Sequence, residues 1–344
     1  MFCIGKCAQY CFFVNHFARF FLVFLLVIIK KYLYCLLFCG VMEKKGYLFV
    51  LATAVVSGFS IFLNKFGVEG INPYVFTFSK NVLVVLFLLS ALFFFKEFRV
   101  ISSLSKFQWL KLSAIGLFGG SVPFLLFFKG LSLSSSAFSA LIHKSTFIFI
   151  AVLAVLFLKE RLSRGFVVAA ALLFVGNLLM LRQTSLAFGF PELLILGAVV
   201  LWSVETVISK HALQELPSRV VAFGRMFFGA LFILAFLIVS GNFSSLVSLS
   251  VSQFSWIFFT SALLLAYVIT WYSGLKRIPA SSAACILVLG SAVTSFLSMV
   301  YAGAFNAIDI AGVLLIAAGT FIVLSQAYVV YLLSKIRNIL PLKN

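Results

Sequence analysis

Two ionisable residues stand side by side within a long apolar run of this sequence. His143 and Lys144 belong to SAFSALIHKSTFIFIAVLAVLFLKER, residues 136–161, where most neighbours are apolar. An ionisable side chain at the centre of a membrane-spanning helix costs about 2.5–3.5 kcal/mol on insertion scales, and such side chains usually face the protein interior or a water-filled cavity. They are therefore the first candidates for binding a solute or a proton. Five lie well inside apolar segments: Lys80, His143, Lys144, Glu205 and Arg225.

The residues around His143 follow a helical spacing that predicts one polar stripe. Positions three and four residues apart share a helix face. The stripe consists of Ser132, Ser136, Ser139, His143 and Thr146. Lys144 lies about 100° further round the helix. We expect Ser139 and His143 to face a cavity, where they bind substrate and His143 can titrate a proton, with Lys144 at the cavity edge. The alternatives are a histidine that holds two helices together and a lysine that contacts a neighbouring carbonyl.

The elements that must position these residues are membrane helices. The 344 residues are 64% apolar and only 10% charged, with a mean hydropathy of +1.21. Apolar stretches of about 20 residues recur, and a helix of that length crosses a bilayer while satisfying its own backbone hydrogen bonds. We predict an all-α polytopic membrane protein with ten transmembrane helices. They are expected near residues 46–65, 73–95, 109–128, 134–158, 165–182, 190–210, 219–240, 255–275, 281–303 and 310–333.

The basic residues predict the orientation of these helices. The net charge is +18, but the lysines and arginines lie mostly in short connectors and form no single face, which argues against a nucleic-acid partner. If the residues before 46 are cytoplasmic, the connectors on that side hold sixteen lysines and arginines, and the opposite side holds Lys65, Lys129 and Arg182. Cytoplasmic loops retain positive charge. We therefore expect a protein of the cell (plasma or inner) membrane with both termini cytoplasmic, counting from Met42.

Residues 1–41 differ from the rest in composition. They are rich in Phe, Cys and Tyr, and Lys30 and Lys31 interrupt their apolar run. Three interpretations are an extra membrane helix, a signal peptide without a clear cleavage site, and an upstream mis-start, with translation beginning at Met42; we favour the last. Three cysteines share a helix face here but lack a nearby acid, so we expect no metal site; they are Cys3, Cys7 and Cys11.

The two halves of the chain resemble each other at an offset of about 145 residues. AVVSGFSIFLNKFG (54–67) aligns with VVLWSVETVISKHA (199–212), and FKGLSLSSSAFSAL (128–141) with YSGLKRIPASSAAC (272–285). The same offset pairs Lys80 with Arg225 and Ser60 with Glu205. Because each half has five spans, the second half must enter the membrane from the opposite side. We predict two inverted five-helix repeats, 42–185 and 186–334, followed by a cytoplasmic tail, 335–344, and such repeats are typical of secondary transporters.

With these blocks, the chain resembles an EamA-type member of the drug/metabolite transporter superfamily over residues 46–333. The resemblance rests on the five-plus-five layout, on Lys80 and Arg225 in the second span of each half, on GLSLSSSAFSAL and GLKRIPASSAAC, and on FLKERLS after the fourth span. It implies a carrier of a small metabolite, often an exporter, with a central cavity lined by both halves. Two positions depart from the family pattern. Glu160 is matched in the second half by Ala304, and Phe147 occupies the place of a common proline.

The charged residues of the second half have two interpretations. Glu205 lies five residues before Lys210, and Arg225 six residues after Arg219. These depths are about 7.5 and 9 Å along a helix, so the two side chains are close enough to form a structural ion pair. Glu205 could instead bind substrate or a proton directly. Lys80 has no matching acid, so it extends to the outer surface, loses its proton or meets an anion.

The intramembrane charges favour an anionic or zwitterionic solute, such as an amino acid or organic acid. Lys80, Lys144 and Arg225 outnumber Glu205. Trp202, Tyr267 and Trp271 line the pathway in this interpretation, or else act as interfacial anchors. The expected partners are a small-molecule substrate, the lipid bilayer and, if transport is coupled, protons; the oligomeric state stays open. We expect no cofactor and no enzymatic activity, since no HExxH or Walker-type motif is present. The alternatives are a membrane-embedded enzyme, a channel and a noncatalytic membrane subunit.

Overall fold

The computed structural model describes residues 41–67, 70–133, 137–181, 188–246 and 249–339. Within these ranges, side chains are described except those of residues 41–44, 65, 67, 137–140 and 327–339. The chain divides into two units, Met1–Lys45 and Gly46–Asn344. The predictions for the first 40 residues therefore fall outside the described residues. The architecture below is that of the second unit.

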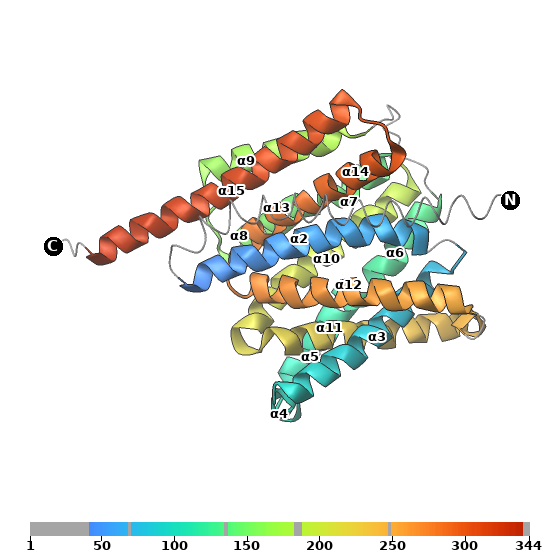
Figure 1. Ribbon diagram of the computed structural model, residues 1–344. Helices are drawn as coiled ribbons and strands as arrows, with labels where there is room; N and C mark the ends of the chain where they lie inside the picture. The colour runs from blue at the N-terminus through green and yellow to red at the C-terminus, as the bar shows by residue number, and fades with distance from the viewer. Residues whose placement is uncertain (1–40, 68–69, 134–136, 182–187, 247–248, 340–344) are drawn as a thin grey trace. The chain divides into compact units, whose positions relative to one another are not determined.

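All regular elements in the described ranges are helices, as Figure 1 shows. The first half contains α2 (Val41–Gly67), α3 (Pro73–Phe94), α4 (Phe98–Ser102), α5 (Lys106–Ile115), a π-helix (Gly116–Ser121), α6 (Val122–Leu133), α7 (Ala137–Lys144), α8 (Thr146–Leu158) and α9 (Arg164–Leu179). The second half contains α10 (Phe190–Glu215), α11 (Ser218–Val239), a 3-10 turn (Phe243–Leu246), α12 (Val251–Leu275), α13 (Ala280–Leu287), α14 (Leu289–Ala302) and α15 (Ala307–Ile339).

Nine segments of the described chain are long and apolar enough to cross a membrane. They are Lys45–Asn64, Pro73–Phe94, Lys106–Leu133, Leu141–Leu158, Phe190–Glu215, Ser218–Val239, Val251–Leu275, Ala280–Ala302 and Ala307–Gln326. The predicted span 165–182 is also helical, but α9 has only 16 residues, fewer than the roughly 17–25 that a crossing uses. The all-helical membrane class is confirmed, whereas the number ten is not.

Local sequence explains where several helices begin and end. Asn72 accepts a hydrogen bond from the Tyr74 amide at 2.9 Å, and Pro73 occupies the first position of α3. Ser105 and Ser250 each form a capping box with a glutamine three residues later. Helices α8 and α14 end on left-handed residues, Lys159 (φ 56°) and Gly303 (φ 63°). These two positions correspond in the repeat, so both halves end this helix in the same way.

The fourth and ninth predicted spans are both interrupted. Ser145 separates α7 from α8, and Val288 separates α13 from α14, at nearly equivalent positions of the repeat. Ser145 donates its hydroxyl to the Leu141 carbonyl at 2.8 Å, a type of contact that bends helices. The members of the predicted polar stripe do not share one continuous helix, because Ser132 lies in α6, His143 in α7 and Thr146 in α8.

Helices from the two halves interlock. In the described part, α3 packs against α11 and α12, α6 against α10, α8 against α13, and α9 against α15, which lie side by side in Figure 1. One close approach between the halves needs glycine: a Cβ on Gly120 would lie 2.9 Å from the Gly229 Cα. Consequently, residues more than 100 positions apart line the same interior.

Candidate functional site

The π-helix in the third span is the centre of the buried polar network. Its sequence is GLFGGS, and π turns inserted into α-helices are frequent at functional sites. The Gly119 carbonyl accepts hydrogen bonds from Trp202 Nε1 at 3.2 Å and Arg225 Nη2 at 3.1 Å. The Gly120 carbonyl accepts one from Asn81 Nδ2 at 3.2 Å. Residues of α3, α10 and α11 are thereby attached to one turn of the third span.

Gly119 also allows Glu205 to approach this turn. A Cβ at Gly119 would lie 2.5 Å from Glu205 Cγ and 3.2 Å from Arg225 Nε. Real Cβ atoms essentially never show a contact below 3.0 Å. Glycine is thus required here by the neighbouring side chains, and the backbone turn is adjacent to both charged groups.

Glu205 and Arg225 are both buried, with exposed fractions of 3% and 7%. The Glu205 carboxylate accepts hydrogen bonds from Ser209 Oγ at 2.5 Å and from the Tyr272 hydroxyl at 2.7 Å. Arg225 interacts electrostatically with Glu205 and Tyr272, and its Nε has no hydrogen-bond partner within the described region. No nitrogen of Arg225 comes within 4.0 Å of a carboxylate oxygen of Glu205, which is the distance that defines the ion pairs between described side chains. The Glu205 carboxylate is bonded to Ser209 and Tyr272, and the Arg225 guanidinium is bonded to the Gly119 carbonyl, so the two charged groups have different hydrogen-bond partners.

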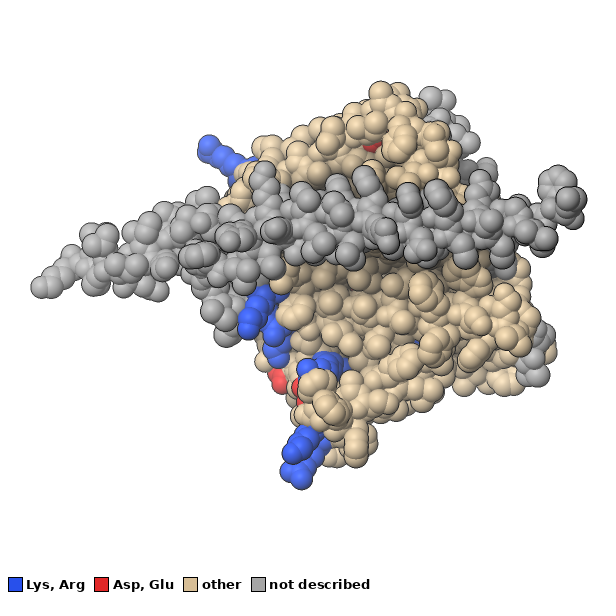
Figure 2. Space-filling model, viewed as in Figure 1, with Lys and Arg blue, Asp and Glu red and all other residues tan. Residues whose placement is uncertain are grey.

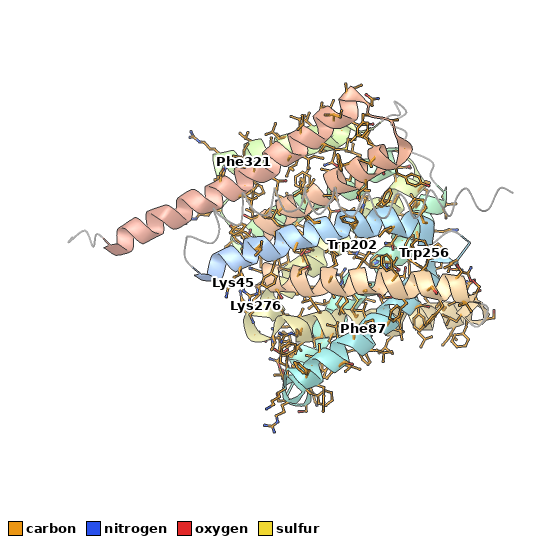
Figure 3. The ribbon with its side chains drawn as sticks, viewed as in Figure 1. Lys45, Phe87, Trp202, Trp256, Lys276 and Phe321 are labelled. Atoms are coloured by element: carbon orange, nitrogen blue, oxygen red, sulfur yellow. The ribbon has the colours of Figure 1, made fainter. Side chains whose placement is uncertain are left out.

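His143 lies in an aromatic cluster. Its ring centroid is 4.8 Å from that of Phe127 and 5.4 Å from that of Trp202, and the side chain is half-buried. Trp202 therefore connects His143 to the Gly119 carbonyl. Figure 3 shows Trp202 about midway along the helices, far from Lys276 at one end. Lys144, next to His143, is also half-buried.

The other predicted substrate-binding residues are placed differently. Tyr267 stacks on Trp271 with centroids 6.4 Å apart and planes 15° apart. Trp271 is 3% exposed and belongs to the apolar core, while Tyr267 is half-buried and interacts with Arg225. The side chain of Ser139 falls outside the described residues.

Lys80 is buried in the protein interior. It is 6% exposed, donates a hydrogen bond from Nζ to Asn64 Oδ1 at 3.1 Å, and lies 4.9 Å from the centroid of the Phe76 ring. Asn64 Nδ2 in turn donates to Ser60 Oγ at 3.4 Å. Asn64 is the last residue of the first apolar span, so this contact directs the Lys80 ammonium towards the end of that span, and the three fates expected for Lys80 stay predictions.

Sequence reasoning missed several polar partners. Asn64 and Ser209 lie one helical turn from Ser60 and Glu205, so an i,i+4 search around each ionisable position would have found them. Asn81 had no such signal, because its partner Gly120 is 39 positions away.

Glu160, whose counterpart in the second half is Ala304, joins the two halves. Its Oε1 accepts from the Ala280 amide at 2.6 Å, and its Oε2 accepts from the Ser281 amide at 3.1 Å and from Ser281 Oγ at 2.5 Å. A carboxylate of the first half therefore caps the first turn of α13 in the second half, where anions are favoured. We call these three contacts the Glu160 clamp.

Two lysines stabilise the connector beside the Glu160 clamp. Lys210 Nζ donates to the carbonyls of Leu275 and Ile278, both at 2.6 Å. Lys276 Nζ donates to the Leu216 carbonyl at 2.9 Å. Burial lowers the pKa of Lys276, and the neighbouring Arg277 lowers it further. The connector between α12 and α13 is thus fixed by two lysines of the second half, beside the first-half carboxylate of the Glu160 clamp. Phe147 occupies the place where a proline is common in the resembling family. It lies in the regular helix α8, and its side chain is buried, with an exposed fraction of 3%.

Across the described chain, no group of three or more His, Cys, Asp or Glu side chains could hold a metal ion. The cysteine positions considered for metal binding fall in the N-terminal residues that the structure leaves undescribed.

A sequence model of the EamA-like transporter family matches residues 44–182 and 189–325, one match in each half. The chain belongs to the EamA-like transporter family. This EamA-like chain is 24% identical over 256 residues to an uncharacterized transporter of Archaeoglobus fulgidus, covering 72% of this chain and 86% of that protein. It is 26% identical over 222 residues to the uncharacterized transporter YyaM of Bacillus subtilis, covering 62% of this chain and 71% of that protein.

The fold of this EamA-like chain also occurs in a solved crystal structure. That structure superposes with a TM-score of 0.65 at 17% identity and covers 81% of this chain and 96% of its own. Family and relatives together establish a multi-pass membrane transporter, whose partners are the lipid bilayer and a small-molecule substrate.

Proposed function

We propose that this transporter carries a small anionic or zwitterionic metabolite, such as an amino acid or organic acid, by alternating access around a site between its two repeats. The proposal rests on buried charged residues within helices, to which both halves contribute. Lys80 comes from the first half and Glu205 and Arg225 from the second, and each is less than 8% exposed. Maintaining such groups in a membrane interior is costly, and they usually mark substrate or ion pathways.

The interrupted helices support the location of the site. Discontinuous spans at corresponding positions of two repeats are typical of substrate sites near the bilayer midplane. Here the interruptions fall at Ser145 and Val288, and the first is two residues after His143. His143 and Trp202 then lie against the solute, with Ser139, Lys144, Tyr267 and Trp271 around the pathway. Glu205 or His143 would take up the proton if transport is coupled to a pH gradient.

The orientation belongs to the same proposal. Figure 2 shows Lys and Arg side chains gathered at one end of the described surface, with few elsewhere on that face. Cytoplasmic loops are enriched in these residues. This distribution supports an orientation with the Lys- and Arg-rich end in the cytoplasm and, counting from Met42, both termini there, in a protein that we place in the plasma or inner membrane. Export is the direction that the family resemblance favours.

The experiment is solute flux in proteoliposomes. Purified protein is reconstituted and tested with radiolabelled amino acids, mono- and dicarboxylic acids and their amides, with and without a pH gradient. We expect flux of at least one carboxylate-bearing solute above that of empty liposomes. Flux confined to cations, or no flux of any solute, would contradict the proposal.

A further inference from the structure

The two repeats place similar polar side chains at equivalent positions. At an offset of 145 residues, Asn64 corresponds to Ser209 and Lys80 to Arg225, while Ser60 corresponds to Glu205. In the second repeat, Ser209 bonds Glu205 one helical turn away. In the first repeat, Asn64 bonds Ser60 across the same interval. The cations are bonded differently, Lys80 to Asn64 and Arg225 to the Gly119 carbonyl, and only the second arrangement contains a carboxylate.

The carboxylate balances the charge of the second-repeat arrangement. Glu205 accepts two hydroxyl hydrogen bonds and lies within electrostatic reach of Arg225. The corresponding cation of the first repeat, Lys80, is bonded to a neutral amide oxygen at 3.1 Å and is 6% exposed. An ammonium offers three donors, and a buried charge is costly unless it is paired. An additional anion beside Lys80 would therefore be strongly favoured.

The serine at the position of the glutamate has a shorter side chain. Glutamate has three more side-chain heavy atoms than serine, and two of its heavy atoms are the carboxylate oxygens that the first repeat lacks here. Ser60 and Asn64 are both half-buried, so protein atoms do not fully cover them. Ser60 Oγ and Asn64 Nδ2 can both donate to an incoming oxygen.

We infer that the carboxylate of the transported solute binds at Lys80, Asn64 and Ser60, in the place that the Glu205 carboxylate occupies in the second repeat. This inference rests on the proposed transport function and narrows its substrate class to solutes with a free carboxylate. Lys80 provides the charge, and Ser60 and Asn64 provide neutral donors. In the second repeat, Glu205 already provides a carboxylate near Arg225, so we do not expect a solute anion to bind there.

The first test replaces the solute carboxylate with one from the protein. Ser60→Glu places a carboxylate where Glu205 lies in the other repeat, and Ser60→Gln is the neutral control of equal size. Both variants fill the space beside Lys80, so both are expected to reduce flux of carboxylate solutes, and we expect the reduction in Ser60→Glu to be at least tenfold greater than that in Ser60→Gln. Equal flux in the two variants would overturn the inference.

The second test examines Lys80 by substrate discrimination. For a solute that is transported, Lys80→Met is expected to raise the KM at least tenfold for the carboxylate form and to change the KM of its amide by less than threefold. Lys80→Arg, which keeps the charge, should restore most of the carboxylate preference. An equal loss for acid and amide would show a merely structural lysine and would refute the assignment.

A third measurement is independent of transport and separates this inference from the proposed function. The thermal midpoint in detergent is compared for Ser60→Glu and Ser60→Gln, each in the wild-type and Lys80→Met backgrounds. We expect Ser60→Glu to be the more stable of the two when Lys80 is present and the less stable when it is replaced. If wild type moves no solute but this coupling is found, the transport proposal fails while the carboxylate position is retained. If the coupling is absent, the inference fails whatever the flux.

Discussion

The Glu160 clamp is expected to hold the transporter in the conformation described here. The carboxylate belongs to the connector after α8, and its three donors belong to the first turn of α13 in the other half. Movement of one repeat against the other must break these contacts. The second half has Ala304 at the equivalent position, so the repeat does not supply a second copy of this carboxylate. Removing Glu160 should therefore destabilise one end state selectively.

The size of the effect follows from the three hydrogen bonds. A hydrogen bond to a charged group contributes about 1.5–3 kcal/mol, and contributions from one group are not additive. Glu160 is half-buried, so solvent screens part of the interaction. For Glu160→Ala we expect a total loss of about 2–4 kcal/mol. About 1.4 kcal/mol corresponds to a factor of ten in an equilibrium constant. The population of the clamped conformation, relative to that of the opened one, would therefore fall roughly 30- to 700-fold.

Cys285 provides a native reporter for this equilibrium. It lies one helical turn after Ser281 in α13, and its thiol is completely buried. With the five cysteines of residues 1–41 replaced by serine, the rate of labelling by a membrane-impermeant maleimide measures opening at this end. Glu160→Ala should accelerate labelling by at least tenfold. Ser281→Ala, which removes one of three contacts, should give an intermediate rate.

The control is Arg161→Gln, because Arg161 is the adjacent residue and is exposed. Its labelling rate should equal that of wild type. Equal rates for Glu160→Ala and Arg161→Gln, with Glu160→Ala fully folded by size-exclusion chromatography, would refute the reasoning.

Three further substitutions test the polar network around the π-helix. Gly119→Ala places a Cβ 2.5 Å from Glu205 Cγ. It should lower the free energy of unfolding by about 1–3 kcal/mol, which is measured as a reduced thermal midpoint. An unchanged thermal midpoint would contradict the tight contact. Tyr272→Phe removes one of the two donors to the buried Glu205 carboxylate and should destabilise by about 1–3 kcal/mol, with Tyr267→Phe as a comparison that leaves this hydrogen bond intact. Glu205→Gln keeps the size of the side chain but removes its charge. If Glu205 is the coupling residue, flux driven by a pH gradient should be lost while solute exchange without a gradient continues, and loss of both would assign Glu205 a structural role.

Several features of the molecule follow from the sequence because they depend on composition and on neighbours along the chain. Recurrent apolar stretches predict membrane helices, since only a helix satisfies the backbone in lipid without external partners. The constant offset between AVVSGFSIFLNKFG and VVLWSVETVISKHA predicts a duplicated architecture, and the family match covers both halves. The same offset identified Lys80 and Arg225 as equivalent positions, but it did not predict which residues each of them contacts. The predicted roles of the binding residues remain predictions.

Tertiary structure decided how these elements meet. The arrangement of Glu205 with Tyr272, of Asn81 with the Gly120 carbonyl and of Glu160 with α13 joins residues 39 to 121 positions apart. Such contacts depend on the rotation and close approach of helices, which glycines at the interfaces permit but helical periodicity does not specify. The π-helix and the interruption at Ser145 likewise arise where hydrogen bonding and packing compete with a regular helix. Spacing along one helix determines which residues share a face, whereas the packing of many helices determines what that face contacts.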